Sequence, residues 1–286
     1  MLYMLISFKT QLMTNNKQNT YMAKASGVSR FAWNWALVNW NVQYQQFKKG
    51  KRDKKPTGMS LKKELNAIKR RDYPWMYEVT KYASQQPFIF LSRAWSDFFK
   101  GKRNRPRLKK KGKSRDSFYV GGDQVKVRGH YVKVPSLGWL RMAEQIKYGG
   151  HINSMTISRS ADKWYVSFSI DVEVSMLPSK NQAKCGVDLG IIALAILSKG
   201  DIRYWVTPKP LQQSLRNLAR YQRRLVKKVK GSNGYNKQKQ KIARLHKRIA
   251  DIRRNTLHQL SAYLVKNFNE IVIEDLNVKG MMANGK

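Results

Sequence analysis

Residues Ala183–Gly200 read AKCGVDLGIIALAILSKG, and they set the organisation of the second half of the chain. Apolar residues alternate with Gly186, Asp188 and Gly190, and the run Ile191–Leu197 continues without a charge. This pattern predicts a buried strand that enters a hairpin and carries one carboxylate. A buried ionised carboxylate is costly unless it is paired, hydrogen-bonded or bound to a metal. We therefore expect Asp188 to have a function, and its flanking glycines would let a metal ion and a phosphate approach the backbone.

A second acidic position ends another short β run. Phe268–Lys279 reads FNEIVIEDLNVK, in which three apolar residues lead directly into Glu274 and Asp275. Carboxylates that converge from two strands are the oxygen ligands that Mg²⁺ prefers and that a two-metal phosphodiester site requires. A simpler explanation stays open, since Asp188 could begin a tight turn and Glu274 with Asp275 could cap a helix.

The overall charge points to a polyanionic partner. The chain has 286 residues, with 57 lysines and arginines against 17 aspartates and glutamates, and a formal net charge of +40. A compact state with this charge repels itself unless a polyanion neutralises it, so nucleic acid is the expected partner. A membrane-surface protein would concentrate its charge beside one apolar face, whereas here basic residues are spread over many segments.

Other features of the composition bound the protein class. Cys185 is the only cysteine, which excludes an intrachain disulfide and a cysteine-based zinc site. No apolar run approaches the roughly 18 residues of a membrane span, and the N-terminal MLYMLISF lacks the features of a signal peptide. We expect no membrane partner and a cytoplasmic location, with nucleoid association in a prokaryote.

Polar side chains on two predicted helices suit nucleic-acid recognition. Arg30 and Asn34 lie one turn apart in a helix expected over residues 17–44, so they share a face that could meet a phosphate or a base edge. Gln85 and Gln86 begin a later apolar helix, and glutamine can pair with adenine. The alternative is that both glutamines are simply exposed at the start of that helix.

Between Lys100 and Arg115 basic residues are frequent and acids are absent, while glycine and proline interrupt any regular pattern. We expect this basic segment not to pack against the protein and to follow a phosphate backbone, with a salt-dependent contribution from each cation. The candidate contacts are Arg103, Arg105, Arg107, Lys109, Lys110 and Lys111.

From Ser117 to Val174 the hydrophobic period changes to two. Several short strands with regular turns predict a small β-barrel, which would include an early strand at Tyr3–Thr10. The barrel would comprise residues 1–14 and 115–177, with a helical domain, 15–114, inserted into it.

The predicted fold class is α+β with several domains. Pro178–Gln182 would link the barrel to a second domain, residues 183–286. In that domain leucines and isoleucines at helical spacing predict two long helices that meet along a narrow apolar seam marked by Leu211, Leu215, Leu218 and Leu225. Asp251 is the only acid between Arg216 and Arg254, which indicates a surface for a phosphate backbone. The candidate contacts there are Arg220, Arg223, Arg224, Arg244, Lys247 and Arg248.

Several motifs in one order resemble a known family. GVDLGI, then LSKG, a basic helical hairpin and IVIEDLNVKGM resemble the RuvC-like nuclease domain of the TnpB family, the RNA-guided DNA nucleases of insertion sequences. SRFAWNWAL, YPWMYEVTKYASQQP, RPRLKKKGKSRDSF and IARLHKRIADIRRNTLHQLS extend the resemblance over nearly the whole chain. The resemblance implies a wedge-type barrel with an inserted recognition domain, followed by an RNase H-like domain.

The resemblance also implies a chemistry and partners. Asp188 and Glu274 would be catalytic and bind Mg²⁺, one ion helping to generate the attacking hydroxide and the other stabilising the leaving 3′ oxygen. Guide RNA and target DNA would be the partners. The region of Gln85 and Gln86 would help to read the short DNA motif beside the target, and the basic hairpin would lie beside the guide–target duplex.

This chain departs from the family pattern at its end. It stops at Lys286, twelve residues after Glu274, before the family's zinc ribbon and third acidic residue. We therefore expect a truncated nuclease domain whose cleavage activity is an open question. The alternatives are a nuclease-dead RNA-guided repressor that occupies DNA, a DDE-type transposase, and a basic protein that coats RNA.

Overall fold

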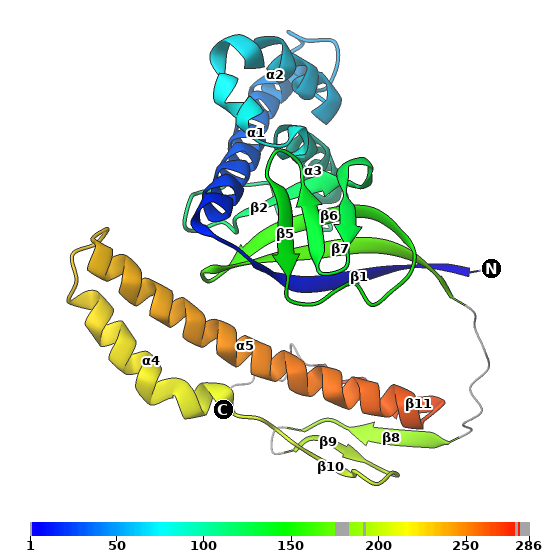
Figure 1. The fold of residues 1–286 in the computed structure, drawn as a ribbon. Helices are drawn as coiled ribbons and strands as arrows, with labels where there is room; N and C mark the ends of the chain where they lie inside the picture. The colour runs from blue at the N-terminus through cyan, green and yellow to red at the C-terminus, as the bar shows by residue number, and fades with distance from the viewer. Residues whose placement is uncertain (1, 175–182, 191–192, 278–279, 281–286) are drawn as a thin grey trace. The chain divides into compact units, whose positions relative to one another are not determined.

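The computed structural model describes residues 2–174, 183–190, 193–277 and 280 (Figure 1). The chain divides into two compact units, Met1–Ser175 and Met176–Lys286, here called the first and second unit. The predicted linker Pro178–Gln182 lies outside the described residues. No helix among the described residues is both long enough and apolar enough to cross a lipid bilayer.

The first unit is built on a seven-stranded antiparallel sheet with the order β2-β6-β7-β1-β5-β4-β3. Its central pair joins β1 to β7 in a continuous register from Leu2↔Val174 to Leu12↔Trp164. The strands are β1 (Leu2–Met13), β2 (Ser117–Gly121), β3 (Lys126–Arg128), β4 (Tyr131–Val134), β5 (Gly138–Met142), β6 (His151–Ser160) and β7 (Lys163–Val174).

The predicted barrel is wrong, because this sheet is open. β2 and β3 are the two ends of the strand order, and within the described residues they do not pair with each other. The alternation of apolar residues predicted the strands correctly, but closure depends on edge strands that meet in register. Here β3 is a short edge with Lys126 and Arg128 exposed, features that discourage further strand pairing.

Three helices lie between β1 and β2 in the sequence. They are α1 (Asn16–Lys48), α2 (Gly58–Asp72) and α3 (Lys81–Phe99), with the short 3₁₀ helix η1 (Pro74–Glu78) before α3, while a second one, η2 (Gly122–Gln124), follows β2. Side chains from the helices and the sheet form one hydrophobic core, which includes Met22, Phe88 and Trp164. Aromatic residues of α1 and α3 lie in this core, and Trp40 stacks on Trp95 with ring centroids 5.7 Å apart.

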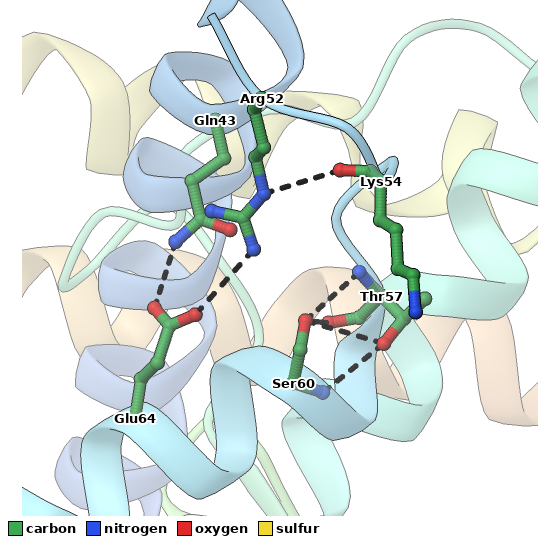
Figure 2. A network of polar contacts seen from close by, with 6 residues as sticks. All are labelled: Gln43, Arg52, Lys54, Thr57, Ser60 and Glu64. Atoms are coloured by element: carbon green, nitrogen blue, oxygen red, sulfur yellow. Dashed lines mark hydrogen bonds and ion pairs between the residues drawn. The ribbon is translucent and has the colours of Figure 1, made fainter. Parts of the chain in front are cut away.

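A polar network fixes the beginning of α2 against α1 (Figure 2). Thr57 caps α2 by accepting the backbone N–H of Ser60, while the Ser60 hydroxyl accepts the backbone N–H of Thr57. Gln43 of α1 donates to Glu64 at 2.7 Å, and Arg52 approaches the other oxygen of that carboxylate at 3.9 Å. The capping hydrogen bonds satisfy backbone donors that a helix end leaves free.

Tyr21 joins three parts of the first unit through one hydroxyl group. The hydroxyl donates to the carbonyl oxygen of Pro135 at 2.6 Å and accepts the backbone N–H of Thr80 at 3.0 Å. It thereby connects α1 with the start of α3 and with the turn between β4 and β5. Burial raises the pKa of Tyr21, so the neutral phenol that makes both hydrogen bonds is favoured.

The second unit combines a four-stranded mixed sheet with two long helices. The strand order is β10-β9-β8-β11, and β8 and β11 are parallel. The elements are β8 (Lys184–Asp188), β9 (Ala193–Leu197), β10 (Tyr204–Val206), α4 (Pro210–Val226), α5 (Asn233–Asn267) and β11 (Glu270–Ile273). Leu260 and Leu264 of α5, with Phe268 just beyond it, pack on Cys185 and Val187 of β8.

Replacing Tyr21 with phenylalanine tests the connecting role of its hydroxyl. The variant leaves the buried N–H of Thr80 without its acceptor, so we expect a loss of about 1–3 kcal/mol of unfolding free energy. Urea unfolding of the full chain measures it. Tyr148→Phe is the matched control, because Tyr148 is 49% exposed. Equal midpoints for the two variants would contradict the assignment.

Candidate metal centre and nucleic-acid interface

The two candidate carboxylates come from the carboxyl ends of neighbouring parallel strands. Ile273 pairs with Val187 in the register of β11 and β8. Asp188 follows Val187 as the last residue of β8, and Glu274 follows Ile273 directly after β11. Because adjacent strands lie about 4.8 Å apart, this register brings the backbones of Asp188 and Glu274 side by side.

The alternation of side chains places the candidate acids on one face of the sheet. Cys185 and Val187 are buried against α5, so Gly186 and Asp188 belong to the opposite face. Asp188 and Glu274 both line an open pocket of about 540 Å³, together with Ile196 and Ser198 of the β9 side. Gly186 has no side chain, so the floor of the pocket beside Asp188 is bare backbone.

Asp188 is exposed, contrary to the buried position expected from the sequence. Glu274 and Asp275 are exposed as well, and every residue of β11 is exposed. The β8–β9 hairpin itself is confirmed by the pairs Val187↔Leu197 and Asp188↔Ile196, although Ile191 and Ile192 lie outside the described residues. Among the described residues only one face of the hairpin is covered, and the carboxylate lies on the other.

The donor set of this pocket suits a hard cation. Within the described residues no group of three or more histidine, cysteine, aspartate or glutamate side chains gathers to hold a metal. Mg²⁺ is commonly held by one or two carboxylates and keeps several waters, so Asp188 and Glu274 fit its requirements. Cys185 is buried on the other face, with its Sγ 3.3 Å from the carbonyl oxygen of Gly186.

The α4–α5 hairpin presents cations from both helices. Leu218 and Ile249 are buried in the seam, and Gln238 donates to the carbonyl oxygen of Tyr221 at 3.0 Å. Leu215, which was expected in the seam, is 50% exposed. The predicted contacts Arg220, Arg223, Arg224, Arg244 and Arg248 are exposed, whereas Lys247 is half-buried and forms an ion pair with Asp251.

The basic segment 100–115 packs on α1, so the prediction that it would not pack is wrong. The indole N–H of Trp33 donates to the carbonyl oxygen of Arg107 at 3.0 Å. Asn34 donates to the carbonyl oxygen of Lys109 at 2.9 Å and accepts its N–H at 2.8 Å. The cationic side chains of the segment repel one another, but its backbone N–H and C=O groups still need hydrogen-bond partners. Side chains of α1 provide those partners.

Arg30 and Asn34 share a face as predicted, and both contact the chain itself. Arg30 forms an ion pair with Asp116 at 2.8 Å, and its side chain is only 16% exposed. Lys109 is half-buried with Nζ 4.2 Å from the ring centroid of Trp33. Burial lowers the pKa of Lys109, and the nearby charge of Arg30 lowers it further. These residues anchor the basic segment.

The anchored segment leaves a row of cations exposed. Arg105 donates to Asn41 at 2.9 Å, and Arg103 approaches Asp97 at 3.5 Å, but both stay accessible. The exposed members of the predicted set are Arg103, Arg105, Arg107, Lys110 and Lys111. A fixed backbone therefore presents these charges to solvent.

Gln85 and Gln86 are half-buried, and Gln85 lines a pocket of about 420 Å³ with a buried lysine. This lysine, Lys69, is 5% exposed. Its Nζ donates to the Ser84 hydroxyl at 2.9 Å and lies 4.3 Å from the ring centroid of Tyr77. Burial lowers the pKa of Lys69.

Lys69 was not predicted from the sequence as a buried or functional residue, although its spacing along α2 indicates the buried face. It lies one helical turn after the buried Leu65 and therefore falls on the buried face of α2. A lysine on an apolar stripe usually extends its ammonium group to solvent, and only the pocket lined by Gln85, Lys81 and Asn66 distinguishes this one.

Comparison with family models places both ends of the chain in one group. Residues 167–285 match a model described as a probable transposase, OrfB of the IS605 type, and residues 1–49 match the model of a helix-turn-helix domain of the same proteins. In this structure residues 1–49 hold β1 followed by the single long helix α1.

Curated relatives agree with these matches. A protein of Escherichia coli named putative RNA-guided DNA endonuclease InsQ is 34% identical over 275 residues, 96% of this chain and 67% of the relative. A putative RNA-guided DNA endonuclease of Streptomyces pristinaespiralis is 32% identical over 222 residues, 76% of this chain and 54% of the relative. This chain thus spans between about half and two thirds of the length of these relatives.

Solved structures are more distant. The cryo-EM structure of a Cas12f1–sgRNA–target DNA complex matches with a TM-score of 0.46 and 14% identity, covering 92% of this chain and 66% of that chain. Since sequence identity to InsQ extends over 96% of the chain, the protein belongs to the TnpB family, the OrfB-type probable transposases of IS605 elements.

Proposed function

We propose that this chain binds a guide RNA and a target DNA and hydrolyses DNA phosphodiesters with Mg²⁺ held by Asp188 and Glu274. The observation that carries the proposal is the parallel register of β8 and β11, which puts both carboxylates at one edge of one sheet. The names of the curated relatives, putative RNA-guided DNA endonucleases, support the choice of substrate and guide.

The carboxylates would act as ligands, and the surrounding pocket would admit the substrate. Mg²⁺, when bound, would lower the pKa of a coordinated water and neutralise charge on the phosphate. The open pocket beside Asp188, Gly186 and Glu274 leaves room for a phosphate group next to the carboxylates. Ser198 accepts the backbone N–H of Gly186 at 2.8 Å, and this hydrogen bond helps to hold β8 against β9 beside the carboxylates.

The exposed cations would hold the nucleic-acid backbones in place. The one-sign surface of the α4–α5 hairpin and the anchored segment 100–115 both present arginines and lysines to solvent. Contacts of this kind orient a protein on nucleic acid without reading its sequence. Arg223, Arg224 and Arg248 on the hairpin, with Arg107 and Lys110 on the segment, are the contacts that we propose.

Gln85 and Lys69 would read a DNA feature from their shared pocket. Glutamine can pair with adenine in the major groove, and a lysine amine donates to guanine or to phosphate. The buried Lys69 has a hydroxyl and an aromatic face as neighbours, and no acid lines the pocket. An acceptor from DNA would therefore compensate a charge that the protein leaves poorly solvated.

A second candidate function is RNA-guided binding of DNA without cleavage. It is favoured by the metal-ligand set, because the described residues bring two acids together and no third. Losing a ligand in a phosphodiesterase site weakens positioning, on which catalysis depends. A DDE-type transposase stays a more distant alternative. DNA cleavage and DNA occupancy, measured separately, distinguish the first two functions.

Substituting Asp188 with alanine tests the metal site. We expect Mg²⁺-dependent cleavage of guide-matched DNA to fall below detection, because a direct ligand is lost, while affinity for the guide RNA stays within about twofold. Cleavage is followed on labelled DNA, and RNA affinity by filter binding.

Asp201→Ala is the matched control, since Asp201 is an exposed acid of the neighbouring β9–β10 turn. Full cleavage by Asp188→Ala would refute the site assignment. Guided DNA occupancy by the unmodified chain without any cleavage would favour the second candidate function.

Substituting Lys69 with methionine tests the pocket on α2. Because the pKa of Lys69 is lowered by burial, wild-type stability should rise as the pH increases from the folded-state pKa to the unfolded value of about 10.4. The methionine variant should lose this pH dependence and be at least as stable at neutral pH. Affinity for target DNA should fall about tenfold or more.

Urea unfolding at several pH values and DNA-binding assays provide the two measurements. Lys63→Met, an exposed position on the same helix, should leave both properties unchanged. Unaltered DNA affinity in the Lys69 variant would remove this pocket from the interface.

A further inference from the structure

The outer face of β3, β4 and β5 carries large and charged side chains that no role assigned so far explains. Along β4 and β5 exposed residues alternate with Val132, Val134, Leu140 and Met142, which are buried in the core of the first unit. The alternation of a strand therefore directs the remaining side chains of these strands to the opposite, outward face.

The strand register arranges these side chains in two rows across the sheet. Lys126 pairs with Lys133, which pairs with Trp139. Arg128 pairs with Tyr131, which pairs with Arg141. We call these six residues the basic aromatic face.

The basic aromatic face is exposed and cationic. Tyr131 is 48% exposed and Trp139 is 44% exposed, and the four cations are exposed as well. The whole stretch 126–142, KVRGHYVKVPSLGWLRM, contains no acidic residue. Exposed aromatic residues are common when they are single, but two on one face surrounded by four cations form a patch that suggests a binding surface.

The spacing of the two rings suits nucleotide bases. Tyr131 and Trp139 are diagonal neighbours on adjacent strands, since Tyr131 pairs with Arg141 and Trp139 lies two residues before it. Diagonal neighbours are about 7–8 Å apart, and neighbouring bases of a single strand can spread beyond the rise of about 3.4 Å that they keep when stacked on each other. Two neighbouring bases of one strand could therefore reach both rings.

We propose that the basic aromatic face binds unpaired bases of RNA, stacking them on Tyr131 and Trp139 while the lysines and arginines contact the adjoining phosphates. Base–aromatic stacking beside a positive surface is how proteins hold single strands. The proposal rests on the proposed function, in which the RNA would be the bound guide.

RNA is the fitting occupant because of where unpaired bases occur. A target DNA reaches the protein as a duplex, and its bases become unpaired only after the guide RNA has already bound and paired with it. Folded RNA displays splayed bases in loops, bulges and ends, and these are what aromatic side chains on sheets bind. The cations attract both polymers and the rings select unpaired strands over duplexes, so the order of binding favours RNA as the occupant.

The test uses the full chain without DNA and without Mg²⁺. The probe is a fluorescein-labelled oligouridylate of about 12 nucleotides, within the site size of about 4–16 nucleotides for sheet-based binders. Its deoxyuridine counterpart and an RNA duplex of the same length serve as comparisons. Binding is measured by fluorescence anisotropy at raised salt, because salt weakens the purely electrostatic binding of RNA to the other basic surfaces.

Tyr131→Ala and Trp139→Ala should each weaken oligouridylate binding about tenfold. Tyr131→Phe and Trp139→Phe should retain most of the affinity, because a ring remains. Tyr3→Ala, at a tyrosine 67% exposed elsewhere in the unit, is the matched control and should have no effect. A 4-thiouridine-substituted probe should crosslink to the peptide that spans residues 129–142. Thermal unfolding verifies that each variant is folded.

Three results would overturn the proposal. One is that the wild type and a variant carrying both Tyr131→Ala and Trp139→Ala, each shown to be folded, bind oligouridylate with the same affinity, or that neither binds it detectably. Another is equal or tighter binding of the deoxyuridine strand or of the RNA duplex, and the third is crosslinking confined to other peptides. Because the assay involves no cleavage and can be repeated in the Asp188→Ala variant, an inactive nuclease site does not affect its outcome.

Discussion

The parallel pairing of β8 with β11 is the constraint on which the proposed chemistry depends. The two strands are separated in the sequence by β9, β10 and the whole α4–α5 hairpin, and they meet because α5 returns the chain to the sheet. Leu260, Leu264 and Phe268 cover the apolar face of β8 and so fix which side of the sheet stays open. A slip of one residue in this register would turn Glu274 to the covered face and separate it from Asp188.

The few acids of this very basic chain hold parts of it together. Asp116 pairs with Arg30, Asp97 approaches Arg103, and Asp251 pairs with Lys247, so each acid steadies a segment that carries several positive charges. Neutral side chains also hold the basic segment 100–115, since Trp33 and Asn34 donate hydrogen bonds to its backbone carbonyl groups. Large areas of uncompensated charge remain, and their mutual repulsion would be relieved by a polyanion.

The first unit illustrates how one sheet can serve several purposes. Its inner face forms a common core with α1, α2 and α3, which lets the helices present Lys69 and Gln85 at a pocket. Its edge strands stay short or charged, so the sheet ends without closing. The outward face of β3, β4 and β5 is left free to carry rings and cations.

Local patterns in the amino-acid sequence were sufficient to predict the strands of period two and the basic helical hairpin. They also indicated the positive charge and the position of Asp188 and Glu274 at the ends of two strands. Each of these features depends on residues that are close together in the chain. Four features came only from the fold: the open sheet, the exposure of Asp188, the packing of segment 100–115 on α1 and the pocket that encloses Lys69. Each of these depends on which distant segment supplies a pairing partner or covers a face. Spacing along one segment contains no information about such partners, since they are fixed by register and packing between remote elements.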